Sequence, residues 1–184
     1  DLIYILKMKK KIIITGGLGY IGTELCKLYS GVSWNHKIIV IDNRFISERV
    51  NQIRNWNMEF VHGDILDKNL INKHCNDADV VHHLAGVTEV PRTKSESSEE
   101  KDKKIKSVAE EGTQNILDAI NNKCKIVFPS THVVFEGIDK VKTNISEEED
   151  LNPTPSYSNS KAINEKQLKN SGKNYVILRL GSVY

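Results

Sequence analysis

The stretch Thr15-Gly16-Gly17-Leu18-Gly19-Tyr20-Ile21-Gly22 decides how this chain folds and what it binds. It follows the β-branched run Lys11–Thr15, which is typical of a buried parallel strand. After it, apolar residues recur at spacings of four and three, which predicts a helix over Tyr20–Ser30. A glycine turn between strand and helix lets the backbone approach a pyrophosphate, and the helix N-terminus offers it free N–H groups. The turn therefore predicts a dinucleotide site, with Gly16, Gly19, Tyr20, Ile21 and Gly22 as its cofactor-binding residues.

Outward from this turn, strand and helix patterns alternate along the chain. Further strands are predicted at Lys37–Asp42, Glu59–His62, Ala78–Leu84, Lys125–Pro129 and Tyr175–Leu180. Further helices are predicted at Leu66–His74, Lys104–Asn121 and Tyr157–Asn170. This alternation predicts an α/β fold, a doubly wound parallel sheet with helices on both faces. We assign residues 10–184 to this domain and treat residues 1–9 as an N-terminal extension that need not be native.

Composition excludes several classes of protein. The 184 residues suffice for one domain, and 26 basic against 24 acidic side chains give a net charge of only +2. This balance argues against a nucleic-acid partner, and the absence of an apolar run of roughly 20 residues argues against a membrane span. Three widely spaced cysteines (Cys26, Cys75 and Cys124) are expected to be buried thiols in a reducing cytoplasm. No His/Cys/Asp cluster has the spacing of a metal site.

Two polar stretches interrupt the alternation, Lys94–Lys106 and Ile138–Asn152. We interpret them as solvated loops or helix starts. Because both follow the C-terminal ends of predicted strands, the alternative is that they flank the mouth of a site.

Two carboxylates follow predicted strands on the cofactor side. Asp42 lies 20 residues after Gly22, where a carboxylate can accept hydrogen bonds from ribose hydroxyls. Its charge would repel a 2′-phosphate and so favours NAD over NADP, although Arg44 could serve such a phosphate. Asp64 is placed to meet the adenine edge, or alternatively to act as a helix N-cap. The neighbouring residues Asn43 and Ile65 complete this part of the predicted cofactor site.

A phenol and an ammonium lie one helical turn apart in Tyr157-Ser158-Asn159-Ser160-Lys161. An ammonium about 4 Å away could lower a tyrosine pKa by up to about three units, toward the range of a general base or acid at neutral pH. Alone, the pair could equally be a surface tyrosine beside a solvated lysine. Thr131, just after the fifth predicted strand, adds a hydroxyl that can hydrogen-bond to a substrate oxygen and to the phenol. Together with a dinucleotide site, these groups predict hydride transfer at an alcohol carbon.

The histidines need no special role by this interpretation. His82 and His83 alternate in a predicted strand, so their side chains point to opposite faces, where we expect packed rather than metal-bound imidazoles. His132, next to Thr131, is the histidine we propose as a substrate contact, and we add Thr88 to the substrate site.

The combined motifs resemble the extended short-chain dehydrogenase/reductase family, in its NAD-dependent nucleotide-sugar epimerase/dehydratase branch, over about Lys10–Tyr184. The matching segments are TGGLGYIG, Asp42, GDI at 63–65, His83-Leu84-Ala85-Gly86, Gly112-Thr113, Ser130-Thr131, Asn152-Pro153, YSNSK with Glu165, and Arg179–Tyr184. The resemblance implies a Rossmann-type sheet, NAD as cofactor, a nucleotide-sugar substrate and a homodimer. It also implies a C-terminal substrate lobe that this chain lacks.

The resemblance further implies roles for individual residues. Tyr157 would be the catalytic base and acid, and Lys161 would bind the nicotinamide ribose and lower the pKa of Tyr157. Thr131 would be the third catalytic residue, and Leu84, Ala85 and Gly86 would line the cofactor channel.

Departures from the family pattern narrow the expected reaction. Dehydratases carry an acidic residue just after the catalytic hydroxyl, whereas this chain has His132 and Val133, which disfavours a 4,6-dehydratase. We therefore expect an NAD-dependent nucleotide-sugar epimerase that oxidises a sugar hydroxyl transiently. One alternative is an NAD(P)H-dependent reductase of a 4-keto nucleotide sugar, because Val134-Phe135-Glu136-Gly137 resembles the VFDG of dTDP-4-dehydrorhamnose reductases. Another is a non-catalytic NAD-binding regulator.

Overall fold

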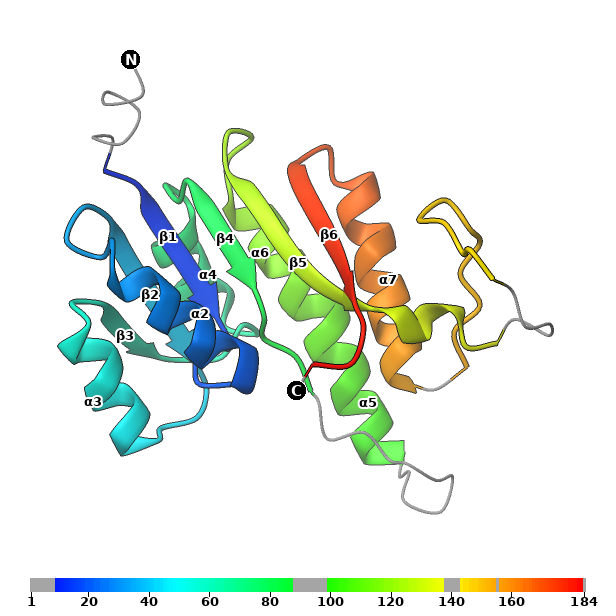
Figure 1. Cartoon of the computed structure of the whole chain (residues 1–184), viewed down its shortest axis with the longest axis horizontal. Helices are drawn as coiled ribbons and strands as arrows, with labels where there is room; N and C mark the ends of the chain where they lie inside the picture. The colour runs from blue at the N-terminus through cyan, green and yellow to red at the C-terminus, as the bar shows by residue number, and fades with distance from the viewer. Residues whose placement is uncertain (1–8, 88–98, 138–142, 155, 184) are drawn as a thin grey trace.

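The computed structural model of the chain describes residues 9–87, 99–137, 143–154 and 156–183, so the assignment of residues 1–8 to an extension lies outside them. Six parallel strands form one sheet in the order β3-β2-β1-β4-β5-β6 (Figure 1). They are β1 (Lys11–Thr15), β2 (Lys37–Asp42), β3 (Glu59–His62), β4 (Val80–His83), β5 (Lys125–Thr131) and β6 (Asn174–Leu180). The chain order of strands reverses between β1 and β4, and such a switch point opens a crevice at the carboxyl ends of the strands.

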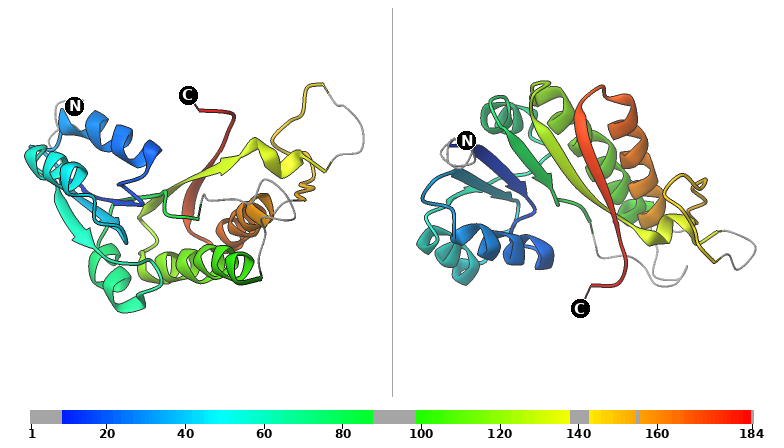
Figure 2. Two further views of the ribbon diagram at one scale, coloured as in Figure 1. Left: turned by 90° about the horizontal axis from the view of Figure 1, so that it is seen from below. Right: turned by 45° about the horizontal axis from the view of Figure 1, so that its top comes forward.

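Helices cover both faces of the sheet (Figure 2). The helices are α2 (Tyr20–Ser30), α3 (Ser47–Asn55), α4 (Lys68–Cys75), α5 (Glu99–Ser107), α6 (Thr113–Ala119) and α7 (Ser156–Asn170). A π-helical turn, η1 (Val108–Gly112), joins α5 to α6, and a 3-10 turn, η2 (His132–Phe135), follows β5. The predicted doubly wound α/β fold is therefore confirmed.

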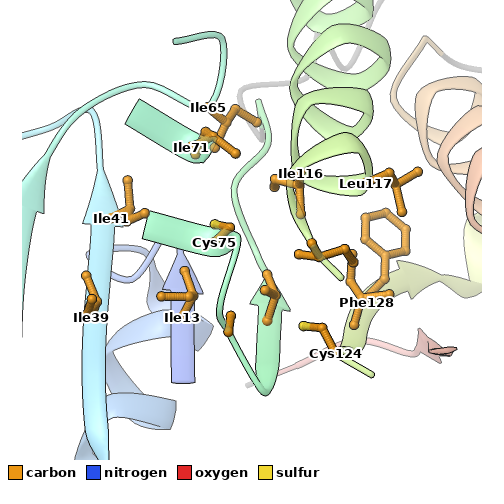
Figure 3. Close-up of a cluster of buried hydrophobic side chains, with 14 of the residues drawn as sticks. Ile13, Ile39, Ile41, Ile65, Ile71, Cys75, Ile116, Leu117, Cys124 and Phe128 are labelled. Atoms are coloured by element: carbon orange, nitrogen blue, oxygen red, sulfur yellow. The ribbon is translucent and has the colours of Figure 1, made fainter. Parts of the chain in front are cut away.

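Strand β1 supplies apolar side chains to two separate cores. Ile13 packs with residues of α4, α6 and α7, whereas Ile12 and Ile14 pack with residues of α2 and α3. Figure 3 shows the first of these cores, in which Ile13 lies near Ile71 and Cys75. Successive side chains of a strand point to opposite faces, and a parallel strand covered on both faces is therefore apolar throughout.

The three cysteines are buried free thiols, as expected. Burial raises the pKa of Cys26 and of Cys75 to about 12, and that of Cys124 to about 11. None of the helices in the described ranges is long and apolar enough to cross a membrane.

The helix predicted at Lys104–Asn121 differs from the observed one. It begins earlier, at Glu99, contains the π-helical turn and ends at Ala119. Acidic side chains occupy the first turn of α5 and lysines its last turn, an arrangement that favours a helix through its macrodipole. The polar stretch Lys94–Lys106 is thus helical from Glu99 onward, whereas the described residues 143–152 of the second stretch form turns without helix or strand.

Other element boundaries shift by one to two residues, and α3 was not predicted. β5 extends to Thr131 rather than to Pro129, and β4 is shorter than the predicted Ala78–Leu84. Helix α3 buries only Val50 and Ile53, too few apolar positions to form a clear helical pattern.

Candidate active site

A cleft of about 650 Å³ contains both the glycine turn and the Tyr157 helix. Its lining includes nearly all the predicted site residues: Gly16, Gly19, Tyr20, Ile21, Gly22, Asp42, Asn43, Asp64, Ile65, Leu84, Ala85, Gly86, Thr131, Tyr157 and Lys161. These residues come from segments as far apart as β1 and α7, and the parallel topology brings them to one edge of the sheet. The structure thus assembles one site from two groups of motifs.

The glycine turn has no room for a side chain at Gly16 or at Gly22. Gly16 has φ +69°, and a Cβ on it would lie 2.7 Å from the Ala85 backbone nitrogen. A Cβ on Gly22 would lie 2.5 Å from the Gly16 carbonyl oxygen. Gly19, the N-cap of α2, provides no side-chain acceptor for the first helical turn. A bare, closely approachable backbone at a helix N-terminus fits a pyrophosphate.

The Asp42 carboxylate is buried at the end of β2, and both of its oxygens accept hydrogen bonds. Its Oδ2 accepts a hydrogen bond from the Leu18 N–H at 2.9 Å, which ties the glycine turn to β2. Its Oδ1 accepts from Arg44 N at 2.9 Å and from Arg44 Nε at 3.2 Å. Arg44 therefore turns its guanidinium back onto Asp42. Arg49, which sequence reasoning did not single out, donates to the Leu18 carbonyl.

Asp64 lines the cleft and is not a helix cap. Its Oδ2 accepts from Asn43 Nδ2 at 2.8 Å, and its Oδ1 accepts from the Leu66 N–H at 2.9 Å. The N-cap of α4 is Asp67, which accepts from the two following N–H groups of the helix. The cap alternative for Asp64 is therefore wrong, because α4 begins two residues later than predicted.

Lys161 of α7 lines the cleft and is largely buried. Its Nζ donates to the Pro129 carbonyl at 3.0 Å and lies 4.5 Å from the centre of the Phe128 ring. Only 9% of the residue is exposed, and this burial lowers the pKa of Lys161 to about 8. The ammonium nevertheless remains mostly protonated at neutral pH.

The expected lowering of the Tyr157 pKa is not what the structure shows. Burial raises the pKa of Tyr157, because the phenolate would lose hydration. The Lys161 ammonium lies 5.9 Å from the Tyr157 ring centre, farther than from the Phe128 ring, and it is directed to the Pro129 carbonyl. The expectation about this pKa was wrong because sequence spacing does not reveal the second partner of the lysine.

Thr131 and its neighbours have distinct surroundings. The Thr131 hydroxyl is buried at the cleft and accepts a hydrogen bond from Val133 N at 3.2 Å. Ser130 donates to Glu165 Oε1 at 2.6 Å. His132 is exposed, with Nδ1 3.1 Å from the Leu180 carbonyl oxygen, and it is not among the described residues that line the cleft. The other proposed substrate residue, Thr88, lies outside the described residues.

Basic residues outnumber acidic ones around the cleft. The charged side chains in its described lining are Arg44, Arg49, Lys104, Lys161, Asp42 and Asp64. Such an excess favours an anionic ligand. Lys104 belongs to the stretch Lys94–Lys106, for which the alternative was that it flanks the mouth of a site, and it does line the cleft. Sequence reasoning missed Arg49, as well as the contribution of Leu180 at the end of β6 and of Gly181 and Val183 after it, because no local pattern reveals which side of the sheet such residues reach.

The two adjacent histidines point to opposite faces, as predicted. His82 Nε2 lies 2.8 Å from the Tyr29 hydroxyl of α2. His83 is buried on the other side, within 3.0 Å of Thr15 Oγ1 and 2.9 Å of Thr113 Oγ1. Within the described ranges, no group of three or more His, Cys, Asp or Glu side chains is placed to hold a metal ion.

The model of the 3-beta hydroxysteroid dehydrogenase/isomerase family matches residues 13–180. The chain belongs to this family. It is a family of extended short-chain dehydrogenases/reductases, so the resemblance drawn from the motifs is confirmed at this level.

Two curated relatives of this chain have names that refer to nucleotide sugars. The UDP-N-acetyl-alpha-D-glucosaminuronate decarboxylase of Bacillus cytotoxicus is 34% identical over 130 residues, which are 70% of this chain and 38% of that protein. The CDP-paratose 2-epimerase of Salmonella typhi is 35% identical over 149 residues, which are 74% of this chain and 41% of that protein. The chain therefore spans about two fifths of the length of these relatives.

A solved structure confirms the Rossmann-type architecture. The Bordetella bronchiseptica enzyme WbmH, crystallised with NAD+, superposes with a TM-score of 0.78 at 27% identity, covering 95% of this chain and 56% of that one.

Proposed function

We propose that the chain is the NAD-binding and catalytic part of a nucleotide-sugar epimerase. The observation that carries this proposal is that one cleft contains both the bare glycine turn and the side chains of Thr131, Tyr157 and Lys161. The family membership, the epimerase among the relatives and the NAD+ bound to WbmH support it. The residues implied by the resemblance therefore have a common place in which to act.

The residues of this cleft would hold NAD at four points. The glycine turn and the N-terminus of α2 would receive the pyrophosphate, for which they leave the backbone uncovered. Asp42, at the end of β2, would accept hydrogen bonds from the adenosine ribose, and Asp64 would lie at the adenine. Lys161 would donate to the nicotinamide ribose. When bound, NAD would supply the hydride acceptor and donor for a sugar carbon.

The side chains of the chain would move the proton. Tyr157 would take the proton of the sugar hydroxyl and return it, while Thr131 would hold the same oxygen by a hydrogen bond. Since burial alone raises the pKa of Tyr157, the phenolate requires a nearby positive charge. Lys161, whose pKa of about 8 keeps it charged at neutral pH, would supply this charge by turning from the Pro129 carbonyl toward the phenol.

A binding and turnover experiment on the full-length gene product tests the proposal. We expect NAD to bind and UDP-, dTDP- or CDP-sugars to be interconverted without net change in NADH. Tyr157→Phe should abolish interconversion and leave NAD affinity unchanged, and retained turnover in this variant would remove Tyr157 from the mechanism. Net consumption of NADH would instead identify the 4-keto sugar reductase, and NAD binding without turnover would identify the regulator. The homodimer and the cytoplasmic location stay predictions.

A further inference from the structure

His83 is a fully buried histidine that the proposed reaction does not use. The residue is 1% exposed, and both ring nitrogens have a hydroxyl partner. Nδ1 lies 3.0 Å from Thr15 Oγ1, and Nε2 lies 2.9 Å from Thr113 Oγ1. Burial, together with the charge of Lys161, lowers the pKa of His83 to about 3, so the imidazole is neutral.

The Thr15 end of this bridge reaches the wall of the cleft. Thr15 is the last residue of β1 and immediately precedes the glycine turn. Its Oγ1 also accepts a hydrogen bond from the Ala85 N–H at 3.2 Å. Ala85 is the residue against which Gly16 packs so closely that no Cβ fits between them. The position of Thr15 Oγ1 therefore affects the positions of both Gly16 and Ala85, which form this wall of the cleft.

The Thr113 end reaches the helix of the proposed catalytic residues. Thr113 Oγ1 accepts from Asn164 Nδ2 at 2.9 Å, and the same amide nitrogen donates to the Ala109 carbonyl at 2.8 Å in the π-helical turn. Asn164 is 4% exposed and lies three residues after Lys161 on α7. A π-helical turn inside a helix is an uncommon feature that is often found at functional sites.

The hydrogen-bonding capacity of the bridge suits a neutral imidazole. The Ala85 N–H and the Asn164 amide each donate to one of the two threonine oxygens, so each hydroxyl retains one proton to donate. A neutral imidazole has one N–H and one acceptor nitrogen at opposite ends of a rigid ring. It can thus accept from one hydroxyl and donate to the other. A single amide side chain could occupy only one of the two ring-nitrogen positions.

We propose that His83 is a positioning residue that holds the Thr15–Ala85 wall of the cleft at a set distance from α7, the helix that bears Tyr157 and Lys161. This inference rests on the proposed function, because it assigns the bridge a purpose in binding NAD next to those side chains. The bridge of Thr15, His83 and Thr113 joins the two groups of motifs, and these three residues are not among the described residues that line the cleft.

Two substitutions of His83 test the two ends of the bridge separately. In His83→Asn the amide lies near the former Nδ1 position and retains the Thr15 partner. In His83→Gln it lies near the former Nε2 position and retains the Thr113 partner. The matched control is His82→Asn, one residue away on the opposite face of the sheet. Thr113→Val removes the second hydroxyl without a change of shape, and Thr113→Ser restores it.

Amide hydrogen exchange and NMR shifts of the 184-residue chain decide the inference without ligand. We expect His83→Gln to increase the exchange rate of the Ala85 N–H about tenfold, equivalent to one lost hydrogen bond, while the side-chain amide signals of Asn164 stay in place. We expect His83→Asn and Thr113→Val to shift the Asn164 signals and to leave Ala85 protected. Thr113→Ser and His82→Asn should resemble wild type. Equal effects at both ends, or none, in folded variants would overturn the inference.

Affinity for NAD then links the bridge to function. We expect His83→Gln to bind NAD about tenfold more weakly than wild type, and His83→Asn to stay within about threefold, since a tenfold change corresponds to about 1.4 kcal/mol. AMP, which lacks the diphosphate and nicotinamide, should bind equally to all variants. If wild type bound no NAD, the proposed function would fail, and the exchange results alone would decide whether His83 holds the two walls together.

Discussion

Arg179 of β6 donates two hydrogen bonds to Glu165 of α7, from Nη2 to Oε2 at 2.8 Å and from Nε to Oε1 at 3.1 Å. The Glu165 side chain is fully buried, and Oε1 also accepts from the Ser130 hydroxyl at 2.6 Å. Because Ser130 precedes Thr131, a single carboxylate connects β5, β6 and the helix of Tyr157 and Lys161. The sequence motifs that contain these residues thus share one buried network.

Removal of the arginine should be costly. Arg179→Met would leave the buried Glu165 carboxylate without its hydrogen-bonded cation and with only the Lys169 ammonium, 4.0 Å away, so we expect a loss of about 3–5 kcal/mol in the free energy of unfolding. Urea denaturation at pH 7 measures it. Arg54→Met, on the exposed surface of α3, should change stability by less than about 0.5 kcal/mol. A loss of similar size in both variants would contradict the importance of the buried pair.

The same variant should change the acid sensitivity of the fold. Burial raises the pKa of Glu165, but hydrogen bonds from Arg179 and Ser130 outweigh it, and the net pKa lies below the usual 4.5. The wild-type carboxylate therefore contributes stability above pH 4.5, which is lost as the pH falls through the lowered pKa. Without Arg179, the pKa of Glu165 should rise, so protonation of this carboxyl group would remove the cost of the buried charge from the variant. The stability difference between the two proteins should shrink below pH 4.5, and a constant difference would contradict this assignment.

Lys161 should make stability rise with pH on the alkaline side. Its pKa falls from 10.5 to about 8 through burial, so the folded chain binds fewer protons than the unfolded chain between these values. The cost of burying the charge, about 3 kcal/mol from the size of this shift, is fully present below pH 8 and disappears toward pH 10.5. Lys161→Met removes it. Its stability relative to wild type should fall as the pH rises from 8 to 10.5, whereas Lys166→Met, at an exposed position of α7, should show no such trend.

The glycine turn should not accept a methyl group at position 22. A Cβ there would meet the Gly16 carbonyl oxygen at 2.5 Å and Gly17 Cα at 2.6 Å, both of them backbone atoms. We expect Gly22→Ala to lower stability by about 1–3 kcal/mol and to abolish NAD binding measured by calorimetry. Gly31→Ala, at the other end of α2, meets nothing closer than 4.0 Å and should bind NAD like wild type.

The pair of Asp42 and Arg44 should control the choice of dinucleotide. Asp42→Asn retains an oxygen that can accept from Leu18 N but loses the charge that holds the Arg44 guanidinium. We expect the ratio of the Kd for NADP to that for NAD to fall about tenfold or more, because the released arginine can bind a 2′-phosphate. Asp64→Asn, in the same cleft, should leave the ratio unchanged. An unchanged ratio in Asp42→Asn would show that the pair does not select the cofactor.

Much of the sheet could be predicted because its central strands, such as β1 and β2, are buried on both faces. Within Lys37–Asp42 the four central residues are all apolar and buried, and the first three strands and α2 have the predicted bounds. The glycine turn was equally easy to predict from the sequence, because close contacts between backbone segments require glycines at fixed spacings. The residues predicted to bind the cofactor line one cleft.

What could not be predicted depends on tertiary partners. The charges of Glu99–Ser107 suggest solvation as readily as they suggest a helix, and only the structure shows that they match the helix dipole. The spacing of Tyr157 and Lys161 gives no sign that the ammonium would be directed to the Pro129 carbonyl. Likewise, a lone histidine in a strand does not disclose that two hydroxyls from separate elements enclose it.

The pairing of β1 with β4 has a consequence for the stage of folding at which the cleft becomes able to bind a ligand. Thr15 and His83 are 68 residues apart along the chain, yet they face each other across this pair of strands. Closure of so long a loop costs entropy before any contact repays it, so non-local parallel pairing is a slow event in folding. A nascent chain that has completed its first three strands would already contain the glycine turn, but no Ala85 to close it. The affinity of the cleft for a diphosphate would thus appear only once the second half of the sheet has docked.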